Sequence, residues 1–139
     1  MIKPVILQKG DIVAIVSTAR KISLQEIEPA IAILDSWGLK VITGKNLFKQ
    51  QNQFAGTDDE RLADFQNALD DKNVKAILFA RGGYGTVRII DRVDWQGFKK
   101  NPKWLIGFSD ITAIHLHVLK HCGIETLHAP MAFNFRKAS

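Results

Sequence analysis

Short apolar segments alternate with amphipathic segments along the whole chain of 139 residues. Residues 11–16 read Asp-Ile-Val-Ala-Ile-Val, with β-branched or small apolar side chains at both odd and even positions. A strand covered on both faces has this pattern, whereas a strand with one solvent-facing side alternates apolar and polar residues. Similar apolar runs occupy residues 39–43, 74–80, 104–108 and 124–129. The pattern therefore predicts five buried strands.

Between these runs, apolar positions recur with the period of a helix. Ser23 and Glu26 have the spacing of a capping box, in which the serine accepts from a helical N–H and the glutamate reaches back to the cap. Thr57 and Glu60 repeat this spacing at the start of a second amphipathic segment. The residues expected to face inward are Ile27, Ala30, Ile31 and Leu34 in the first helix, and Leu62, Phe65, Ala68 and Leu69 in the second. The first helix is expected to end at Gly38.

The order of these elements predicts the fold class. A short helix at residues 86–90 and a longer one at residues 110–121, closed by Gly123, complete the strand–helix alternation. Such crossovers are right-handed and give parallel strands. We therefore expect an α/β fold, with a doubly wound, mainly parallel sheet of about five strands and helices on both faces. No repeat or linker divides residues 1–139, which are expected to form one domain with a polar loop at residues 44–56.

Composition and charge narrow the functional classes. Hydrophobic residues make up 46% and charged residues 24%, as in soluble globular proteins. The first residues lack the features of a signal peptide, and no apolar stretch approaches the ~20 residues of a membrane span. We therefore expect a cytoplasmic protein without a membrane partner. The net charge of +5 comes from scattered residues without a nucleic-acid module, so it is interpreted as a solvated surface with some attraction for carboxylates.

The single cysteine limits the chemistry further. One thiol allows neither an internal disulfide nor a cysteine zinc cluster, and we expect no metal site. Cys122 follows His121, which would suggest a thiol nucleophile with its base. Consecutive residues of a helix point in different directions, however, so Cys122 is interpreted as a buried structural thiol.

Ligands of doubly wound sheets bind beyond the carboxyl ends of the strands. Three loops leave these ends with reactive or conformationally unusual residues: 17–18, 81–85 and 109–110. Ser109 lies between an apolar strand and a helix, which is the position of a nucleophile elbow. Serine is also a common helix N-cap, and Ile111 replaces the last glycine of Gly-x-Ser-x-Gly. The residues alone leave both roles open for Ser109.

The glycine-rich loop favours the role of Ser109 as a nucleophile over that of a helix N-cap. Gly82, Gly83 and Gly85 permit a close approach of the backbone to a ligand. Their spacing fits neither the dinucleotide-binding pattern nor a P-loop, so a nucleotide site is weakly supported. A wall of backbone amides facing Ser109 fits better.

Five ordered motifs carry a resemblance to a known family. They are Lys-Gly-Asp-Ile-Val-Ala-Ile-Val-Ser at 9–17, Ala-Arg-Gly-Gly-Tyr-Gly at 80–85, Asn-Pro-Lys at 101–103, Ile-Gly-Phe-Ser-Asp-Ile-Thr at 106–112 and His-Ala-Pro-Met at 128–131. Together they resemble the N-terminal domain of the LD-carboxypeptidase family, which includes the microcin C immunity peptidases. The likeness covers nearly the whole chain.

The resemblance implies a cytoplasmic serine peptidase that acts without metal or cofactor, usually as a homodimer. Its substrates would be peptidoglycan-derived peptides, cleaved between an L-configured centre and a terminal D-amino acid. Ser109 would be the nucleophile of a Ser-Glu-His triad, and the amides of Asp110 and Gly83 would form the oxyanion hole. Beside this site, Ser17 is a possible substrate-binding residue. Arg81 is a second possible substrate-binding residue, for a substrate carboxylate. The alternatives for Arg81 are a surface arginine or an ion pair with an acid such as Asp110.

One departure from the family pattern is large. The glutamate and histidine of the family's triad belong to a C-terminal domain that these residues do not include. His115, His117 and His121 are expected to point away from Ser109. His128 lies at the correct edge of the sheet, but in the family pattern its position belongs to a turn and not to the triad. The chain alone is therefore expected to be inactive for want of a general base. Two alternatives remain: a non-catalytic α/β module that binds a small molecule or dimerises, and an amidase of aminoacyl-nucleotide toxins.

Overall fold

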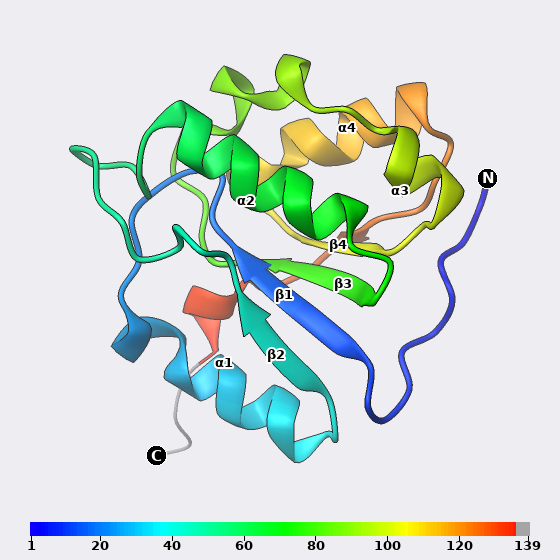
Figure 1. Ribbon diagram of the computed structural model, residues 1–139, viewed down its shortest axis with the longest axis horizontal. Coiled ribbons are helices and arrows are strands. Elements are labelled where there is room, and N and C mark those ends of the chain that lie inside the picture. The colour runs from blue at the N-terminus through cyan, green and yellow to red at the C-terminus, as the bar shows by residue number, and fades with distance from the viewer. Residues whose placement is uncertain (136–139) are drawn as a thin grey trace.

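One parallel sheet of five strands forms the centre of the molecule (Figure 1). The computed structural model describes residues 1–135, so the last four residues of the expected domain lie outside the described part. The strand order is β2-β1-β3-β4-β5, and every pair is parallel. The strands are β1 (Ile12–Val16), β2 (Lys40–Thr43), β3 (Val74–Phe79), β4 (Trp104–Gly107) and β5 (Leu127–His128). The predicted fold class is confirmed.

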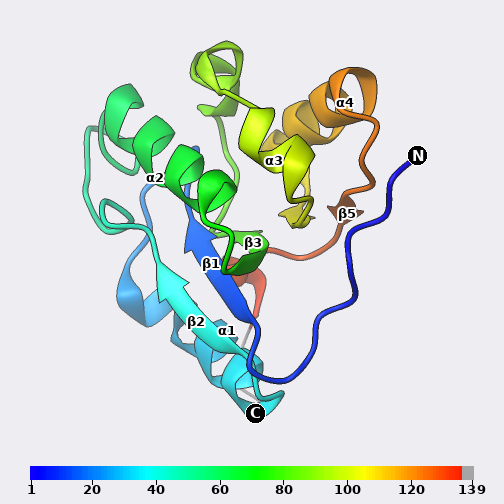
Figure 2. The same ribbon diagram turned by 45° about the vertical axis from the view of Figure 1, so that its right-hand side comes forward.

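Helices cover both faces of this sheet, as expected for a doubly wound fold. Figures 1 and 2 show α1 (Leu24–Ser36) on one face and α2 (Asp58–Asp70), α3 (Gln96–Lys100) and α4 (Thr112–His121) on the other. Successive side chains of β1 point to opposite faces of the sheet, so they contribute to two separate core clusters. Val13 and Ile15 pack in the cluster that includes the buried residues of α1, and Ala14 and Val16 pack with the residues of α2 to α4. None of the helices in residues 1–135 has the length and apolar character needed to cross a membrane.

Both predicted capping boxes are present. The amide of Glu26 donates to Ser23 Oγ at 3.3 Å, and the amide of Ser23 donates to Glu26 Oε1 at 3.1 Å. Thr57 and Glu60 make the same reciprocal pair at 3.1 and 3.0 Å. Each box satisfies two backbone donors that a helix start otherwise leaves unpaired, so the two longest helices begin where the sequence predicts.

The buried face of α2 differs from the prediction. Leu62 is only partly buried, whereas Arg61 and Asp64 are 1% and 4% exposed. Each buried charge has hydrogen-bond partners: Asp64 accepts from the backbone and the side chain of Asn46, at 2.9 and 3.0 Å. Ile31 of α1 is likewise partly rather than fully buried. The spacing of apolar residues identified the helix but not the polar side chains that are buried on its inner face.

Several element boundaries also differ. Residues 86–90 do not form one short helix; two 3₁₀ turns, Thr86–Arg88 and Ile90–Arg92, replace it. The helix α3 (Gln96–Lys100) was not predicted from the sequence. The expected strand at 124–129 is regular only at Leu127–His128, because Ile124 pairs with Ile2 of the N-terminal arm in an isolated bridge.

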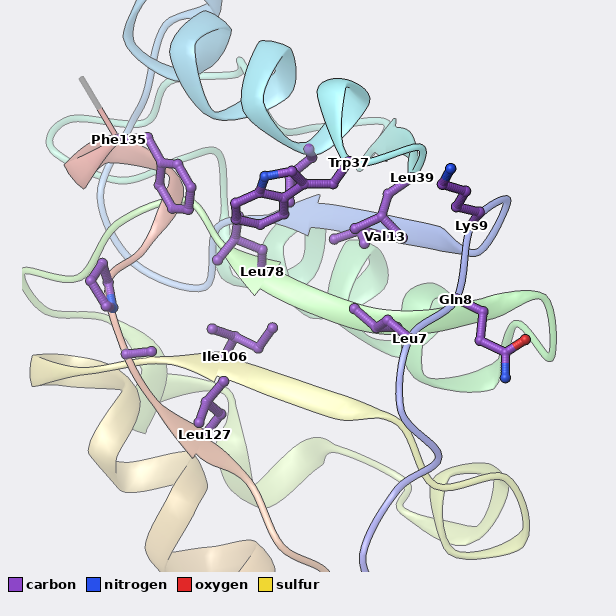
Figure 3. Close-up of a pocket in the computed structure, with 13 residues that line it drawn as sticks. Leu7, Gln8, Lys9, Val13, Trp37, Leu39, Leu78, Ile106, Leu127 and Phe135 are labelled. Atoms are coloured by element: carbon purple, nitrogen blue, oxygen red, sulfur yellow. The ribbon is translucent and has the colours of Figure 1, made fainter. Parts of the chain in front are cut away.

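An apolar groove of about 550 Å³ lies on the face of the sheet that carries α1 (Figure 3). It opens beside α1, where Leu78 of β3, Ile106 of β4 and Leu127 of β5 line it. Trp37 forms part of its wall and is 59% exposed. This face is therefore less completely covered than the face packed by α2, α3 and α4.

Candidate active site

The candidate site lies at the carboxyl edge of the sheet, where the strand order reverses. The chain passes from β1 to β2 on one side and returns to β3 on the other. Loops that leave such a reversal diverge onto opposite faces and create a crevice for ligands. The loops after β1 and β3 are in contact here, because the amide of Arg20 donates to Gly82 O at 3.4 Å. The loop after β4 completes the edge.

Ser109 occupies a sharp turn between β4 and the helical segment. Its φ is +59°, in the left-handed region that residues with a side chain rarely adopt. The residue is exposed, and a single 3₁₀ turn (Ser109–Ile111) leads from it into α4. The predicted strand-to-helix turn is therefore confirmed, with the first part of the expected helix wound as 3₁₀. The role of Ser109 as nucleophile stays a prediction.

The helix-capping interpretation of Ser109 is wrong. Phe108 and Ile111 are the residues that precede the 3₁₀ turn and α4, and neither start has a side-chain capping hydrogen bond. The Ser109 hydroxyl thus does not satisfy the helix amides. An uncommitted hydroxyl on a strained backbone is what a nucleophile elbow presents.

Gly107 and His115 support the turn at Ser109. Gly107 ends β4, and a Cβ at that position would lie 3.0 Å from two side-chain atoms of Ile111. The glycine thereby lets the chain fold back closely onto the helix start. His115 Nε2 lies 2.8 Å from Gly107 O, and its Nδ1 lies 2.6 Å from Thr126 Oγ1. Because a carbonyl can only accept, Nε2 carries a proton.

The glycine loop lies against the Ser109–Asp110 turn. A Cβ at Gly82 would lie 3.4 Å from the Asp110 amide nitrogen, so the two backbones are near neighbours. The Asp110 carboxylate accepts from the amide of Thr86 at 3.1 Å, which ties the far end of the loop to the same turn. Gly83 and Gly85 have φ values of +111° and +139°, as predicted for glycines that shape a tight loop. The assignment of the Gly83 and Asp110 amides to an oxyanion hole stays a prediction.

Buried polar contacts fix the loops after β1 and β3 to each other. The Thr18 and Thr86 hydroxyl oxygens lie 2.7 Å apart. A Cβ at Gly85 would lie 3.1 Å from Thr18 O and from Ala19 Cα, so only glycine fits there. Thr18 and Thr86 are 0% and 1% exposed, which makes this contact part of the interior. The contact fixes Thr86, the residue that follows the glycine loop and donates to Asp110.

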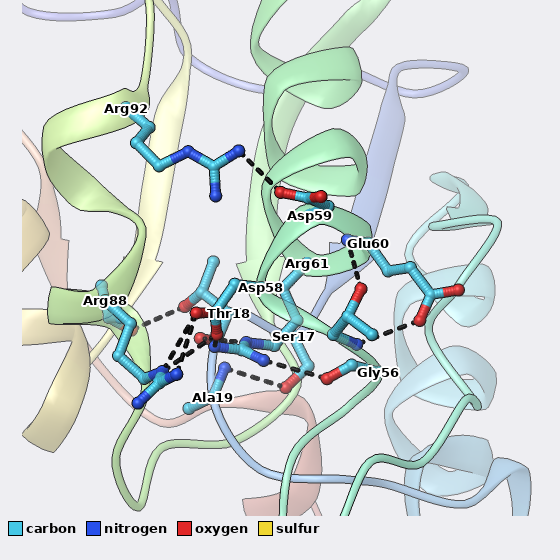
Figure 4. Close-up of polar contacts among 12 residues, drawn as sticks. Ser17, Thr18, Ala19, Gly56, Asp58, Asp59, Glu60, Arg61, Arg88 and Arg92 are labelled. Atoms are coloured by element: carbon cyan, nitrogen blue, oxygen red, sulfur yellow. Dashed lines mark hydrogen bonds and ion pairs between the residues drawn. The ribbon is translucent and has the colours of Figure 1, made fainter.

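Arg61 of α2 braces the same region (Figure 4). Its guanidinium donates to Thr18 O at 3.1 Å, to Gly56 O at 2.9 Å and to Asp58 Oδ1 at 2.6 Å. The pKa of Asp58 is lowered, first by the hydrogen bond from Arg88 and also by Arg61. Sequence reasoning missed Arg61, because an arginine at an inward helix position carries no signal that distinguishes it from a surface one.

Ser17 lies inside the protein rather than on the crevice wall. It is 2% exposed, and its hydroxyl donates to Arg20 O at 2.7 Å. The amide of Ala19 also donates to Ser17 Oγ, at 3.4 Å. The hydroxyl is thus engaged in shaping the loop after β1. Its possible contact with substrate stays a prediction.

Arg81 is engaged on the α1 side of the sheet. Its guanidinium lies 3.8 Å from a carboxylate oxygen of Glu26 and 3.4 Å from Lys21 O. It also stacks over the ring of Phe133, with 4.3 Å from Cζ to the ring centroid. The ion-pair interpretation is correct in kind, but the acid is Glu26 and not Asp110. A role in substrate binding stays a prediction, and these contacts compete with it.

No histidine hydrogen-bonds to Ser109 within residues 1–135. His115 is committed to Gly107 O and Thr126, and His117 stacks on Trp95 with 5.3 Å between ring centroids. Burial lowers the pKa of His117, and the neighbouring His121 lowers it further. His128 is exposed at the end of β5, with its ring centroid 6.0 Å from that of Phe108. The described residues also contain no cluster of three or more His, Cys, Asp or Glu suited to a metal ion.

Cys122 follows α4 and is partly buried. Burial raises the pKa of its thiol, which disfavours the reactive thiolate. The expectation of a structural thiol therefore agrees with its surroundings, but Cys122 is partly rather than fully buried.

Comparison with known proteins decides the family. The family model described as the LD-carboxypeptidase N-terminal domain matches residues 13–129. The chain belongs to the LD-carboxypeptidase family. A Bacillus subtilis protein named "Probable murein peptide carboxypeptidase" is 41% identical over 129 residues, which cover 93% of this chain. The "Murein tetrapeptide carboxypeptidase" of Pseudomonas aeruginosa is 31% identical over 121 residues, or 86% of the chain.

A solved structure also superposes closely on this chain. The crystal structure of an MccF-like protein from Bacillus anthracis matches with a TM-score of 0.91 and 28% identity, over 97% of this chain and 42% of that one. The chain spans 40% of the Bacillus subtilis relative and 39% of the Pseudomonas aeruginosa relative. The remaining length of these two carboxypeptidases has no counterpart in the residues described here.

Proposed function

We propose that this chain is the nucleophile-bearing N-terminal half of a serine-type LD-carboxypeptidase. Its substrates would be peptidoglycan-derived peptides, cut between an L-configured centre and a terminal D-amino acid. The observation that carries the proposal is the exposed Ser109 with φ +59° between β4 and α4, in a turn that contacts the glycine loop through Asp110. The names of the murein peptide carboxypeptidases that it resembles support the substrate class.

In this reaction Ser109 Oγ attacks the scissile carbonyl carbon, and a general base takes the hydroxyl proton. The carbonyl oxygen becomes an oxyanion, which the amides of Asp110 and Gly83 stabilise through hydrogen bonds. Collapse of this intermediate breaks the C–N bond, and the D-amino acid leaves after its nitrogen receives the proton. Water then hydrolyses the acyl-enzyme ester by the same sequence. No metal or cofactor takes part in these steps.

The base and its orienting carboxylate would come from a C-terminal domain, as in the family. The histidines of the described residues support this division of the triad, because none hydrogen-bonds to Ser109. The apolar groove beside α1 supports it too, since an open apolar face favours association with further polypeptide. We place the intact protein in the cytoplasm, as a homodimer.

The test is a complementation assay with an L,D-linked tetrapeptide. The 139-residue chain is assayed alone and after mixing with the separately expressed C-terminal domain of a full-length relative. We expect no turnover by the chain alone and release of the terminal D-amino acid on mixing, abolished by Ser109→Ala. Turnover by the chain alone, lost in both Ser109→Ala and His128→Ala, would instead identify His128 as the base. Hydrolysis of an aminoacyl-nucleotide analogue, with the peptide left intact, would favour the amidase.

A further inference from the structure

The backbone of Arg20 is hydrogen-bonded to the glycine loop and to the loop after β1. Its amide donates to Gly82 O at 3.4 Å, and its carbonyl accepts from the buried Ser17 hydroxyl at 2.7 Å. The residue also pairs with Phe54 in an antiparallel bridge, so the loop after β1 is held from a second side. A side chain that starts from so well fixed a position loses little backbone entropy when it binds a ligand.

The side chain of Arg20 crosses the glycine loop. A Cβ at Gly83 would lie 2.5 Å from Arg20 Cδ and 2.6 Å from both Cγ and Nε, so the arginine occupies the space that a side chain at 83 would need. Gly82, the preceding residue, is next to the Asp110 amide. Arg20 and Asp110 therefore contact two consecutive glycines, Gly83 and Gly82 respectively.

The Arg20 guanidinium differs in its contacts from the other arginines of residues 1–135. Among the described residues it makes no side-chain hydrogen bond or ion pair, and the residue is exposed. Its neighbours differ: the guanidiniums of Arg61, Arg81, Arg88 and Arg92 each contact a carboxylate. An unpaired, always charged group beside the backbone of the glycine loop is available for an anion.

We propose that Arg20 binds the terminal carboxylate of the peptide. The proposal rests on the proposed function, since it assigns a substrate contact within that site. The terminal carboxylate is bonded to the Cα next to the leaving nitrogen, so it lies close to the bond that Ser109 attacks. A guanidinium can hold both its oxygens in a planar, bidentate pair. Such a contact would restrict the enzyme to the last residue of a chain, because an internal peptide bond has no carboxylate there.

This assignment replaces the more obvious candidate from the sequence. Arg81 adjoins the glycines along the chain, but its guanidinium is held by Glu26 and stacked on Phe133. Arg20 is distant in sequence and reaches the glycines only because β1 and β3 are neighbours in the sheet. Ser17 then has a positioning role, since its hydroxyl holds the Arg20 carbonyl.

The experiment measures binding, so it does not need the general base. The ¹⁵N-labelled 139-residue chain, in a Ser109→Ala background, is titrated with Nα-acetyl-L-lysyl-D-alanine and with its C-terminal amide. Both ligands should shift the Gly83 and Asp110 amide resonances, with the acid about 10- to 100-fold tighter, as expected for a charged hydrogen-bonded pair. Arg20→Gln should remove this preference, and the matched control Arg81→Gln should retain it. Circular dichroism confirms that each variant is folded.

The other outcomes separate this assignment from the proposed function. A preference that survives Arg20→Gln but not Arg81→Gln would overturn the role of Arg20 and leave the peptidase site in place. Equal binding of acid and amide would also overturn it, because no carboxylate contact would then exist. If neither ligand shifts the Gly83 and Asp110 resonances, the peptide site and the proposed function fail together with it.

Discussion

The hydroxyl oxygens of Thr18 and Thr86 lie 2.7 Å apart, in a buried contact between residues 68 positions apart in the sequence. This pair joins the loop after β1 to the start of the segment that follows the glycine loop. Thr86 in turn donates its amide to Asp110, next to the proposed nucleophile. The alignment of the glycine loop with the Ser109 turn thus depends on a polar contact that neither loop can make alone.

We expect Thr86→Val to lower the free energy of unfolding by about 1–3 kcal/mol, because it leaves the buried Thr18 hydroxyl unpaired. Valine has nearly the shape of threonine, so the double variant Thr18→Val/Thr86→Val should lose much less than the sum of the two single variants. Urea denaturation of the four proteins measures this coupling. Strictly additive losses would show that the two hydroxyls do not interact.

At position 109 we expect glycine to be more stabilising than alanine, which is the reverse of their usual order within a helix. At φ +59° a side chain costs roughly 1–2 kcal/mol, which glycine avoids. We expect Ser109→Gly to be more stable than Ser109→Ala by about 1 kcal/mol, as measured by chemical denaturation. The control is Ala113→Gly within α4, which should be less stable than the wild type, since glycine weakens ordinary helix. If Ser109→Ala is the more stable variant, the left-handed turn is absent in solution.

Arg61 should be the arginine whose loss costs most in stability. Arg61→Met would remove donors from Thr18 O and Gly56 O and leave both carbonyls underpaired, with an expected loss of about 3 kcal/mol. The control is Arg92→Met, because the Arg92–Asp59 pair is largely exposed and should contribute at most about 0.5 kcal/mol. Thermal and urea unfolding compare the two. Equal effects would contradict the bracing role of Arg61.

Lys103 should make the free energy of unfolding change with pH in the alkaline range. It is 1% exposed, its ammonium donates to Ala68 O and Asp71 O near the end of α2, and burial lowers its pKa from 10.5 to about 8. Between these values the unfolded chain binds a proton that the folded chain does not. The free energy of unfolding therefore gains a contribution that rises with pH from about 8 to 10.5, by at most about 1.4 kcal/mol per pH unit.

The measurement is urea unfolding of the wild type and of Lys103→Met between pH 7 and 10.5, the window that follows from the shifted pKa. The difference between the two curves isolates Lys103 from the other groups that titrate there. We expect the stability of the wild type relative to the variant to increase with pH. A difference that stays constant would mean that Lys103 keeps an ordinary pKa in the folded protein.

The apolar pattern predicted the sheet well because burial on both faces leaves a strong signal in each strand. It also placed Ser109 correctly, since the strand from Trp104 ends at Gly107, two residues before it. The pattern failed where polar side chains are buried: Arg61 and Asp64 lie inward on α2 only because loops from elsewhere supply their partners. Such partners cannot be read from the helix itself.

The candidate site was predicted in outline for a similar reason. The glycines and Ser109 lie at strand ends, and a parallel sheet brings those ends together. The positions of the Arg81 and Arg20 side chains could not be predicted from the sequence, because they depend on which loops lie side by side. Arg81 stands next to the glycines in sequence yet turns to the α1 face, and Arg20 reaches them from another loop. His115 has no signal at all, because its contact with Gly107 depends on how α4 packs beneath the turn.

The strand order has a consequence for the way the chain can fold during synthesis. β2 adds to one side of β1, and β3, β4 and β5 then add to the other side in the order in which they are made. No strand has to enter between two that are already paired, so a nascent chain can extend the sheet from its first strand outward. The glycine loop is complete before β4 arrives with Ser109, and the nucleophile therefore docks onto a wall already in place. Only the N-terminal arm must wait longer, because Ile2 finds its partner at Ile124.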